Sequence, residues 1–158
     1  MYKRQFHSYL SSCDKQFGFK KGYGCRNAIY TVRIIVYDIT KEGSTVNMCA
    51  IDLSKAFDKV NHHALFIKLM KRLIPTELLE ILENWLSECF ACVRWNNCWS
   101  DMFCVCSGVR QGSVLSPLLF AIYIDDIGKL YNVILHADDI ILLAPSVSID
   151  VTKIVNCL

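Results

Sequence analysis

The chain has 158 residues, of which 53% are hydrophobic and 20% are charged, and its formal net charge is +2. A chain of this length and composition is expected to form one globular domain without disulfides or a structural metal, which excludes a disordered protein. The longest apolar stretch, Val114 to Ile124, is interrupted by Ser116 and Pro117 and is too short to span a bilayer, so no membrane association is expected.

Basic residues are concentrated near the amino terminus. Residues 1–33 carry seven Lys or Arg and one Asp, whereas the rest of the chain carries ten basic and fourteen acidic residues. This basic lead-in could contact a polyanion, although an ordinary solvated surface explains the charges equally well. The basic residues in it are Lys3, Arg4, Lys15, Lys20, Lys21, Arg26 and Arg33.

The chain contains nine cysteines, whose use depends on the redox state of the cellular compartment. The chain does not begin with the apolar core of a secretory signal, so we expect a reducing intracellular compartment and free thiols that act as small core residues. A cluster of five raises the alternative of a zinc-stabilised interaction module. Its spacing matches no usual paired-ligand pattern and no His pair accompanies it, which disfavours zinc. The five are Cys89, Cys92, Cys98, Cys104 and Cys106.

The first half of the chain predicts mostly helices. No sustained periodicity marks the first 21 residues, and apolar residues at helical spacing then predict a helix over residues 27–41. A short β-prone stretch predicts a strand over residues 45–52. Two helical pieces are expected over residues 55–60, capped by Ser54, and over residues 63–73.

The second half alternates between helices and strand pairs. Pro75 is expected at the first position of a helix that runs to Phe90, and residues 93–105 predict a strand pair around Asn96-Asn97. The loop Gly108–Gly112 leads into a helix.

That helix is expected to be capped by Ser113 or Ser116, to carry Pro117 in its first turn and to end at Gly128. A hairpin follows, and the last residues are expected to start another helix. This order of elements predicts an α+β fold, with an antiparallel sheet and helices packed on one face.

The stretch from Val133 to Ala144 places Asp138 and Asp139 between two apolar runs, which predicts a β-hairpin with both aspartates in its turn. Asp-Asp is a poor turn compared with Asn-Gly or Asp-Gly, and two adjacent carboxylates repel each other unless a cation or proton lies between them. The turn is therefore a candidate divalent-metal site. The alternative is a solvated polar turn.

A second acidic position comes from the end of the first strand. If that strand pairs beside the hairpin, Asp52 converges with Asp138 and Asp139, and the three carboxylates could hold two Mg²⁺ ions for phosphoryl transfer. Asp58 is a weaker candidate that more plausibly caps a helix. The pair Asp125-Asp126 is interpreted as a solvated pair late in a helix.

At this point the residues resemble a known family. Cys49–His62, with Asp52, Phe57 and Asp58, is similar to motif A of reverse transcriptases from non-long-terminal-repeat (non-LTR) retrotransposons. Gly108–Phe120 resembles their motif B and His136–Asp139 their motif C, while Gln16–Gly22 resembles the block before motif A. The four blocks stand in the family's order, which makes the signal specific.

The resemblance implies roles for the site residues. Asp52 and Asp138 would be the principal ligands of two Mg²⁺ ions, with Mn²⁺ as a possible substitute, and Asp139 would lie beside them. Phe57 would be the aromatic steric gate against the ribose 2′-hydroxyl; the alternative, which would be preferred without the surrounding motif, is a core phenylalanine in a helix. Gln111 and Gly112 would line the nucleotide and template pocket.

Two further positions each have two possible roles. Arg110 would contact phosphate or simply be a loop charge. His136 replaces the aromatic residue, most often tyrosine, that the family carries two positions before Asp138, and it could pack against the primer sugar. A histidine can also gain a positive charge near neutral pH, close to the proposed metals.

The resemblance further implies a domain layout and partners. Residues 1–158 would be a partial reverse transcriptase domain: about 1–44 a basic lead-in and fingers-side helix, about 45–144 the palm core, and 145–158 the start of a truncated helix. We expect no thumb and no endonuclease domain. The expected partners are an RNA template, a DNA primer and deoxynucleoside triphosphates, with a nuclear location; the alternative is a catalytically inactive nucleic-acid-binding remnant.

Overall fold

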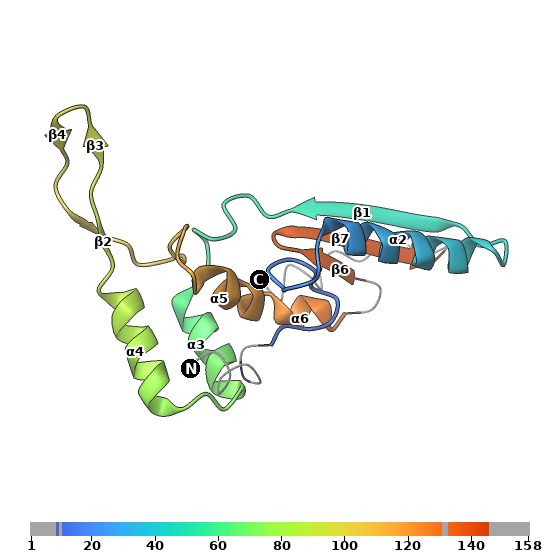
Figure 1. The fold of residues 1–158 in the computed structure, drawn as a ribbon, viewed down its shortest axis with the longest axis horizontal. Helices are drawn as coiled ribbons and strands as arrows, with labels where there is room; N and C mark the ends of the chain where they lie inside the picture. Colours follow the sequence, from blue (N-terminus) through green and yellow to red (C-terminus); the bar gives the residue numbers. More distant parts are fainter. Residues whose placement is uncertain (1–8, 10, 131–132, 146–158) are drawn as a thin grey trace.

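The computed structural model describes residue 9 and residues 11–130 and 133–145. Its centre is a three-stranded antiparallel sheet in the order β1 (Val46–Asp52), β7 (Asp139–Pro145), β6 (Val133–His136). One helix runs along this sheet and the other helices lie to one side of it (Figure 1), so the predicted α+β fold with an antiparallel sheet is confirmed. The predicted helix over residues 145–158 lies outside the described residues, apart from Pro145, which ends β7.

The hairpin of β6 and β7 forms where two short apolar runs meet, as predicted. Its register pairs Val133 with Leu142 and His136 with Asp139. Successive residues of β7 point to opposite faces, as in any strand, so that Ile140 joins one apolar cluster and Leu143 another. The sheet is therefore covered on both faces, which explains why these strands are apolar throughout rather than alternating.

Helix α2 (Cys25–Thr40) covers one face of the sheet. Its apolar residues recur at helical spacing and its buried residue, Ala28, packs with Ile134 and Leu143. The chain enters this helix at Gly24, whose backbone N–H donates to the Asn27 side chain at 3.1 Å. The helix predicted over residues 27–41 is thus confirmed, two residues longer at its start.

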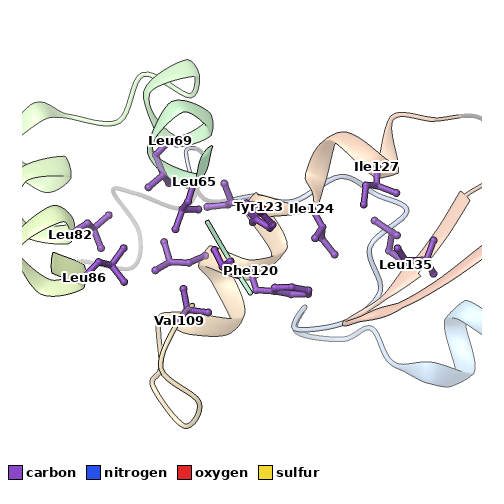
Figure 2. Close-up of a cluster of buried hydrophobic side chains, with 14 of the residues drawn as sticks. Leu65, Leu69, Leu82, Leu86, Val109, Phe120, Tyr123, Ile124, Ile127 and Leu135 are labelled. Carbon is purple, nitrogen blue, oxygen red and sulfur yellow. The ribbon is translucent and has the colours of Figure 1, made fainter. Parts of the chain in front are cut away.

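The opposite face carries the larger core. It is formed with α3 (His62–Lys71), α4 (Thr76–Ser87), α5 (Ser116–Tyr123) and α6 (Asp125–Gly128). Figure 2 shows side chains from these helices converging around Phe120, with Leu135 of the sheet at one end. The helices that follow β1 therefore lie on one side of the sheet, as predicted, while α2 adds the second layer.

The segment from Lys55 to Val60 is not the predicted helix. It is a series of turns, and Lys55 has a φ of 56°, in the left-handed region that a helix cannot contain. Neither Ser54 nor Asp58 caps a helix. The cap of α3 is Asn61, whose side chain accepts the Ala64 N–H at 3.0 Å.

Other helix ends also differ from the prediction. Pro75 is the residue before α4 rather than its first residue. The helix ends at Ser87 and does not reach Phe90, which belongs to a strand. Neither predicted serine caps α5, which follows Leu115 without a side-chain cap, although Pro117 does lie in its first turn. Ile124 separates α5 from α6, so the predicted single helix ending at Gly128 is two short ones.

Four two-residue strands follow α4. The pair β3 (Arg94–Trp95) and β4 (Cys98–Trp99) is joined by the predicted Asn96-Asn97 turn, while β2 (Phe90–Ala91) pairs with β5 (Phe103–Cys104). This arm projects away from the rest of the molecule (Figure 1), and the Trp95 and Trp99 side chains are 78% and 62% exposed.

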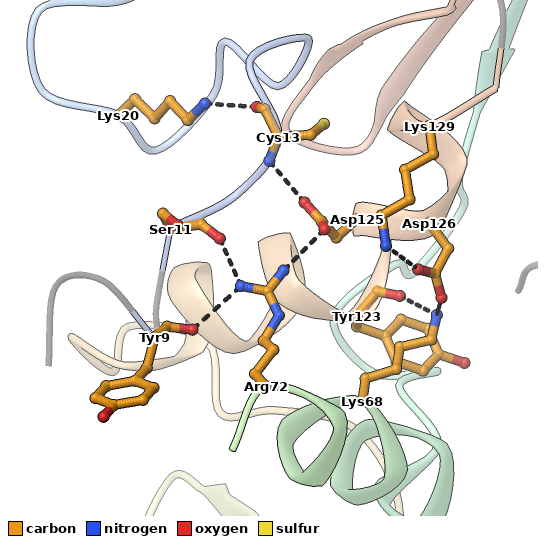
Figure 3. A network of polar contacts seen from close by, with 10 residues as sticks. All are labelled: Tyr9, Ser11, Cys13, Lys20, Lys68, Arg72, Tyr123, Asp125, Asp126 and Lys129. Atoms are coloured by element: carbon orange, nitrogen blue, oxygen red, sulfur yellow. Dashed lines mark hydrogen bonds and ion pairs between the residues drawn. The ribbon is translucent and has the colours of Figure 1, made fainter. Parts of the chain in front are cut away.

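The prediction that Asp125 is solvated is wrong. Its carboxylate is buried and forms an ion pair with Arg72 at 2.8 Å (Figure 3). It also accepts the Cys13 backbone N–H at 2.6 Å, and Arg72 donates to the Tyr9 and Ser11 carbonyls. The network joins α3, α6 and the lead-in. Asp125 is therefore bound by protein groups and is not solvated.

Asp126, the second residue of that pair, is half-exposed. Partial burial alone would raise the pKa of its carboxyl, but the hydrogen bond from Lys129 and the charges of Lys68 and Lys129 hold the pKa below its usual range. Figure 3 shows both lysine side chains directed at this carboxylate. Asp126 is therefore the negatively charged ion-pair partner of both lysines.

Candidate active site at the end of the sheet

The hairpin turn consists of Ala137 and Asp138, because His136 and Asp139 are Cα partners at the ends of β6 and β7. The prediction that both aspartates occupy the turn is thus wrong by one residue: Asp138 is in the turn and Asp139 is the first residue of β7. Ala137 adopts a φ of 58°, the left-handed conformation that a tight turn requires.

Strand β1 pairs with β7 so that Asp52 is the Cα partner of Asp139. Directly opposed residues of an antiparallel pair have their Cβ atoms about 4.5–5.5 Å apart on one face. The expectation that Asp52 would lie beside the hairpin is therefore confirmed. Asp138 follows immediately at the turn, so the ends of β1 and the hairpin bring all three acidic residues to the same end of the sheet.

These carboxylates have no counter-charge from the described part of the chain, where no ion pair involves Asp52, Asp138 or Asp139. Asp52 and Asp139 are exposed and Asp138 is half-buried. Carboxylate oxygens are the ligands that Mg²⁺ and Mn²⁺ prefer, and Mg²⁺ is commonly held by one or two carboxylates together with substrate phosphates and water. The oxygen donors at this end of the sheet are therefore of the kind that Mg²⁺ or Mn²⁺ binds.

The structure does not, however, gather a complete set of protein ligands. Across residues 9, 11–130 and 133–145, no group of three His, Cys, Asp or Glu side chains is arranged to hold a metal ion. The opposed pair Asp52 and Asp139 fits a site that a substrate completes, in preference to a closed site built from protein ligands alone.

Phe57, five residues after Asp52 at the end of β1, lies in a row of three aromatic rings. Its ring stacks on Phe120 with centroids 4.7 Å apart and meets the edge of Phe19 at 5.9 Å. Phe57 is half-buried and packs against the larger apolar cluster, as the core alternative expects, but it belongs to the turns after β1 and not to a helix. Phe120 supports one face of the ring, and Phe19 brings the lead-in against motif A.

The loop of motif B packs directly on the turns of motif A. The Gly108 N–H donates to Val60 O at 2.8 Å and the Val109 N–H to Phe57 O at 2.8 Å. Gln111, an exposed residue predicted to line the pocket, donates from Nε2 to Asp58 Oδ1 at 3.2 Å. Asp58 thus orients Gln111, a partnership that sequence spacing alone did not suggest.

Arg110 and Gly112, the other predicted site residues of this loop, do not lie together with Gln111. The Arg110 guanidinium lies 5.4 Å from the centroid of the Trp85 ring in α4, and its Nε donates to Cys89 Sγ at 3.1 Å. Gly112 has a φ of 86° and open space where a side chain would be. Arg110 therefore packs toward α4, while Gln111 faces motif A.

Gln16 is the residue of this region that sequence reasoning passed over. It was noted as part of a motif, yet its side chain is buried and bonds to the backbone of Ala137 in the hairpin turn. His136, at the start of that turn, is half-buried. The contact between Gln16 and the turn is a tertiary feature that spacing along the chain does not predict. The only signal for it in the sequence is a polar residue that precedes the apolar and glycine residues Phe17-Gly18-Phe19.

The cysteines do not form the alternative zinc site in the described region. Cys89 is buried and accepts the Arg110 hydrogen bond, whereas Cys92 and Cys98 are exposed. Cys104 and Cys106 have their Sγ atoms 3.7 Å apart, and the hydrogen bond between them raises the pKa of Cys104. A pair of thiols two residues apart supplies only half of a structural zinc site.

Comparison with known proteins agrees with this arrangement. Residues 3–158 match the family model described as reverse transcriptase (RNA-dependent DNA polymerase). The chain is 32% identical over 114 residues to the probable RNA-directed DNA polymerase from transposon BS of Drosophila melanogaster, which covers 72% of this chain and 12% of that protein. It is 30% identical over 112 residues to the RNA-directed DNA polymerase from mobile element jockey of Drosophila funebris, with 70% and 12% covered.

A third relative aligns over more of the chain. The Pol polyprotein from type-2 retrotransposable element R2DM of Drosophila melanogaster is 27% identical over 153 residues, which covers 89% of this chain and 14% of that protein. The chain belongs to the reverse transcriptase family, and the resemblance to enzymes of non-LTR retrotransposons is confirmed. It spans 12–14% of the length of these relatives.

Proposed function

We propose that this chain is the palm region of an RNA-directed DNA polymerase. The observation that carries the proposal is the register of the sheet, in which Asp52 of β1 is the partner of Asp139 and adjoins Asp138 in the hairpin turn. The reaction would be attack of a primer 3′-hydroxyl on the α-phosphate of a deoxynucleoside triphosphate, with pyrophosphate as the leaving group. The partners would be an RNA template and a DNA primer.

In this proposal, Asp52, Asp138 and Asp139 hold two divalent ions, Mg²⁺ or in its place Mn²⁺. When bound, such ions neutralise charge on the phosphates and polarise the attacking and leaving oxygens. The contribution of the chain is to hold the carboxylates in place. The pairing of β1 with β7 does this through the backbone, so that no movement is needed to bring Asp52 beside Asp139.

The remaining predicted residues take positions around the substrate. Phe57, supported on one side by Phe120, would exclude the ribose 2′-hydroxyl. Gln111, Gly112 and Arg110 would contact nucleotide, template and phosphate, and His136 would pack against the primer sugar. The bond from Gln111 to Asp58 would keep the amide directed at motif A in the absence of substrate.

The proposed domain layout assigns about 1–44 to a lead-in and fingers-side helix and about 45–144 to the palm core. Within the lead-in, Lys15 and Lys20 bond to backbone carbonyls of Leu130 and Cys13, whereas Arg26 and Arg33 are exposed on α2. We propose an intracellular, nuclear site of action. Among the described residues, no helix has both the length and the apolar character to cross a membrane.

The proposal is tested by Mn²⁺ binding, measured by electron paramagnetic resonance, and by primer extension on poly-rA/oligo-dT with Mg²⁺ or Mn²⁺. The variants Asp52→Asn, Asp138→Asn and Asp139→Asn are expected to lose incorporation and to weaken Mn²⁺ binding beyond the about 10- to 100-fold typical of an outer-shell change. The matched control is Asp101→Asn, an exposed aspartate between β4 and β5.

Two results would separate the alternatives. Mn²⁺ binding unchanged in all three variants would refute the carboxylate site. A folded chain that binds nucleic acid, with affinity that falls steeply with salt but neither metal binding nor incorporation, would identify the catalytically inactive nucleic-acid-binding alternative.

A further inference from the structure

The segment from Cys13 to Phe19 lies directly against the candidate active site, although it is far from it in sequence. Gln16 forms a parallel bridge with Leu135 of β6. The Leu135 N–H donates to Lys15 O at 2.9 Å, and the Phe17 N–H donates to Leu135 O at 2.8 Å. This short stretch of backbone therefore extends the sheet beside the strand that leads into the hairpin turn.

The Gln16 side chain bonds to both polar backbone groups of Ala137. Its Oε1 accepts the Ala137 N–H at 3.1 Å and the Gly18 N–H at 2.8 Å, while its Nε2 donates to Ala137 O at 3.3 Å. Gln16 is only 1% exposed. A buried amide is costly unless it is hydrogen-bonded, so these bonds account for a glutamine at this position.

The turn that Gln16 holds has two features that need support. Ala137 is a non-glycine residue with a φ of 58°, a conformation that is unfavourable for an L-amino acid. The neighbouring Asp138 is one of the carboxylates that repel each other at this end of the sheet. Both effects favour opening of the turn, and the hydrogen bonds from Gln16 oppose it.

Gly18 completes the contact from the other side. A Cβ atom at this position would lie 2.3 Å from Ala137 N and 2.9 Å from Ala137 Cα. Real Cβ atoms do not approach backbone atoms so closely. Only glycine therefore lets the lead-in contact the turn along its backbone, which places Gln16 within reach of Ala137.

We propose that Gln16 is a positioning residue for the active site: with Gly18, it fixes the Ala137-Asp138 turn and so holds the Asp138 carboxylate for metal binding. This inference rests on the proposed function for its metal. In this role Gln16 acts through its bonds to Ala137 in the turn and not directly on substrate or metal. The role requires a donor and an acceptor at the end of one side chain, which an ionised carboxylate or a leucine cannot supply together.

The test compares Gln16→Leu and Gln16→Glu with the wild-type chain. Leucine removes all three hydrogen bonds, whereas glutamate, when ionised, keeps the two that Oε1 accepts and loses the one that Nε2 donates. Leu82→Ala is the control, because it removes buried apolar volume from α4 and lowers stability without contacting the turn. Two quantities are measured: amide hydrogen exchange of Ala137 by NMR, and Mn²⁺ affinity by electron paramagnetic resonance.

For Gln16→Leu we expect fast exchange of the Ala137 amide and Mn²⁺ affinity lower by about tenfold. Gln16→Glu is expected to retain protection of that amide but to lose part of the affinity, and it decides the matter if Gln16→Leu does not fold. Leu82→Ala is expected to bind Mn²⁺ like the wild type. If the role of Gln16 were merely structural, both Gln16 variants would bind Mn²⁺ like the wild type, as Leu82→Ala is expected to do.

The outcomes for the two proposals are distinguishable. If the wild type binds Mn²⁺ and the Gln16 variants bind it equally well with a protected Ala137 amide, the positioning role is overturned while the proposed function stands. If the wild type binds no Mn²⁺, the proposed metal site fails. In that case, unchanged exchange of Ala137 in Gln16→Leu would also overturn the claim that Gln16 fixes the turn.

Discussion

Gly108 shows how a single residue determines where motif B lies. Its φ is 84°, and a Cβ atom there would lie 2.7 Å from Asp58 O and 2.8 Å from Asp58 Cα. Its N–H and carbonyl are both used, by Val60 O and by His62 Nε2 at 2.7 Å. The loop that carries Arg110, Gln111 and Gly112 therefore depends on the absence of a side chain at one position.

We expect Gly108→Ala to lower the free energy of unfolding by more than about 2 kcal/mol, because it combines an unfavourable φ with a backbone collision. Gly43→Ala is the matched control, since Gly43 has a φ of 81° and no atom within 4 Å of an added Cβ. That change should cost only about 1 kcal/mol, the price of the φ alone. Urea denaturation measures both; equal losses would show that the contact with Asp58 contributes nothing.

The acidic residues make a related point about what spacing can predict. Their arrangement at one end of the sheet followed from local patterns, because strand periodicity and one assumed pairing were enough to bring Asp52 beside the hairpin. The exact turn residues did not follow, since they depend on the φ of Ala137 and on its bonds to Gln16. Likewise, nothing in the pair Asp125-Asp126 distinguishes a buried residue from an exposed one.

At the scale of elements, the link between Arg72 and Asp125 joins segments that are distant in sequence. The ion pair at 2.8 Å connects the end of α3 to the start of α6, and the Arg72 guanidinium reaches the backbone of the lead-in at Tyr9 and Ser11. The side chains of Arg72 and Asp125 are 20% and 11% exposed. Removal of one partner would leave the other charged in a poorly solvated place.

We predict that Arg72→Met lowers the free energy of unfolding by about 3 kcal/mol, because Asp125 is left without its counter-charge. The double variant Arg72→Met with Asp125→Asn is expected to regain part of that loss, since no isolated charge remains. Thermal and urea denaturation of the two single variants and the double variant form the cycle that measures the coupling. Strictly additive effects would contradict an energetic link between the two side chains.

Elements also show where local sequence rules failed. The stretch from Lys55 to Val60 has helical composition, yet contacts with the motif B loop hold it as turns, through bonds such as Val109 N–H to Phe57 O. In that stretch a tertiary contact outweighs a local preference of about 1 kcal/mol. Helix α5 begins without a serine cap for a local reason: Ser113 Oγ accepts the Leu115 N–H at 3.3 Å, before the helix, and Ser116 is already its first residue.

For the whole molecule, the two apolar clusters meet in the sheet. Strand β6 contributes Val133 and Leu135 to the larger cluster and Ile134 to the smaller one. The arm of β3 and β4, in contrast, has exposed residues on both strands and stands away from either cluster (Figure 1). Stability should therefore be unevenly distributed along the chain.

We expect hydrogen exchange followed by mass spectrometry to show the slowest exchange in peptides from β6 and β7 and the fastest in peptides from β3 and β4. Peptides from β1 are an internal control: β1 and β6 are both edge strands, but β6 is buried and also bonds to the backbone of Lys15 and Phe17, whereas β1 is largely exposed, so the exchange of β1 should be intermediate. Equal protection of the arm and of β6 would contradict the description of the sheet as the most stable unit.

The sequence by itself determined the family, the α+β class, the β-hairpin and the identity of the acidic residues, because each of these depends on local periodicity or on motifs that are contiguous along the chain. Only the tertiary structure decided how those pieces contact one another. The lead-in lies against the hairpin, Gln16 bonds to Ala137, Asp58 bonds to Gln111 and Asp125 is buried beside Arg72. The physical reason is that hydrogen bonds and burial between residues 53 to 121 positions apart leave no periodic trace in either segment.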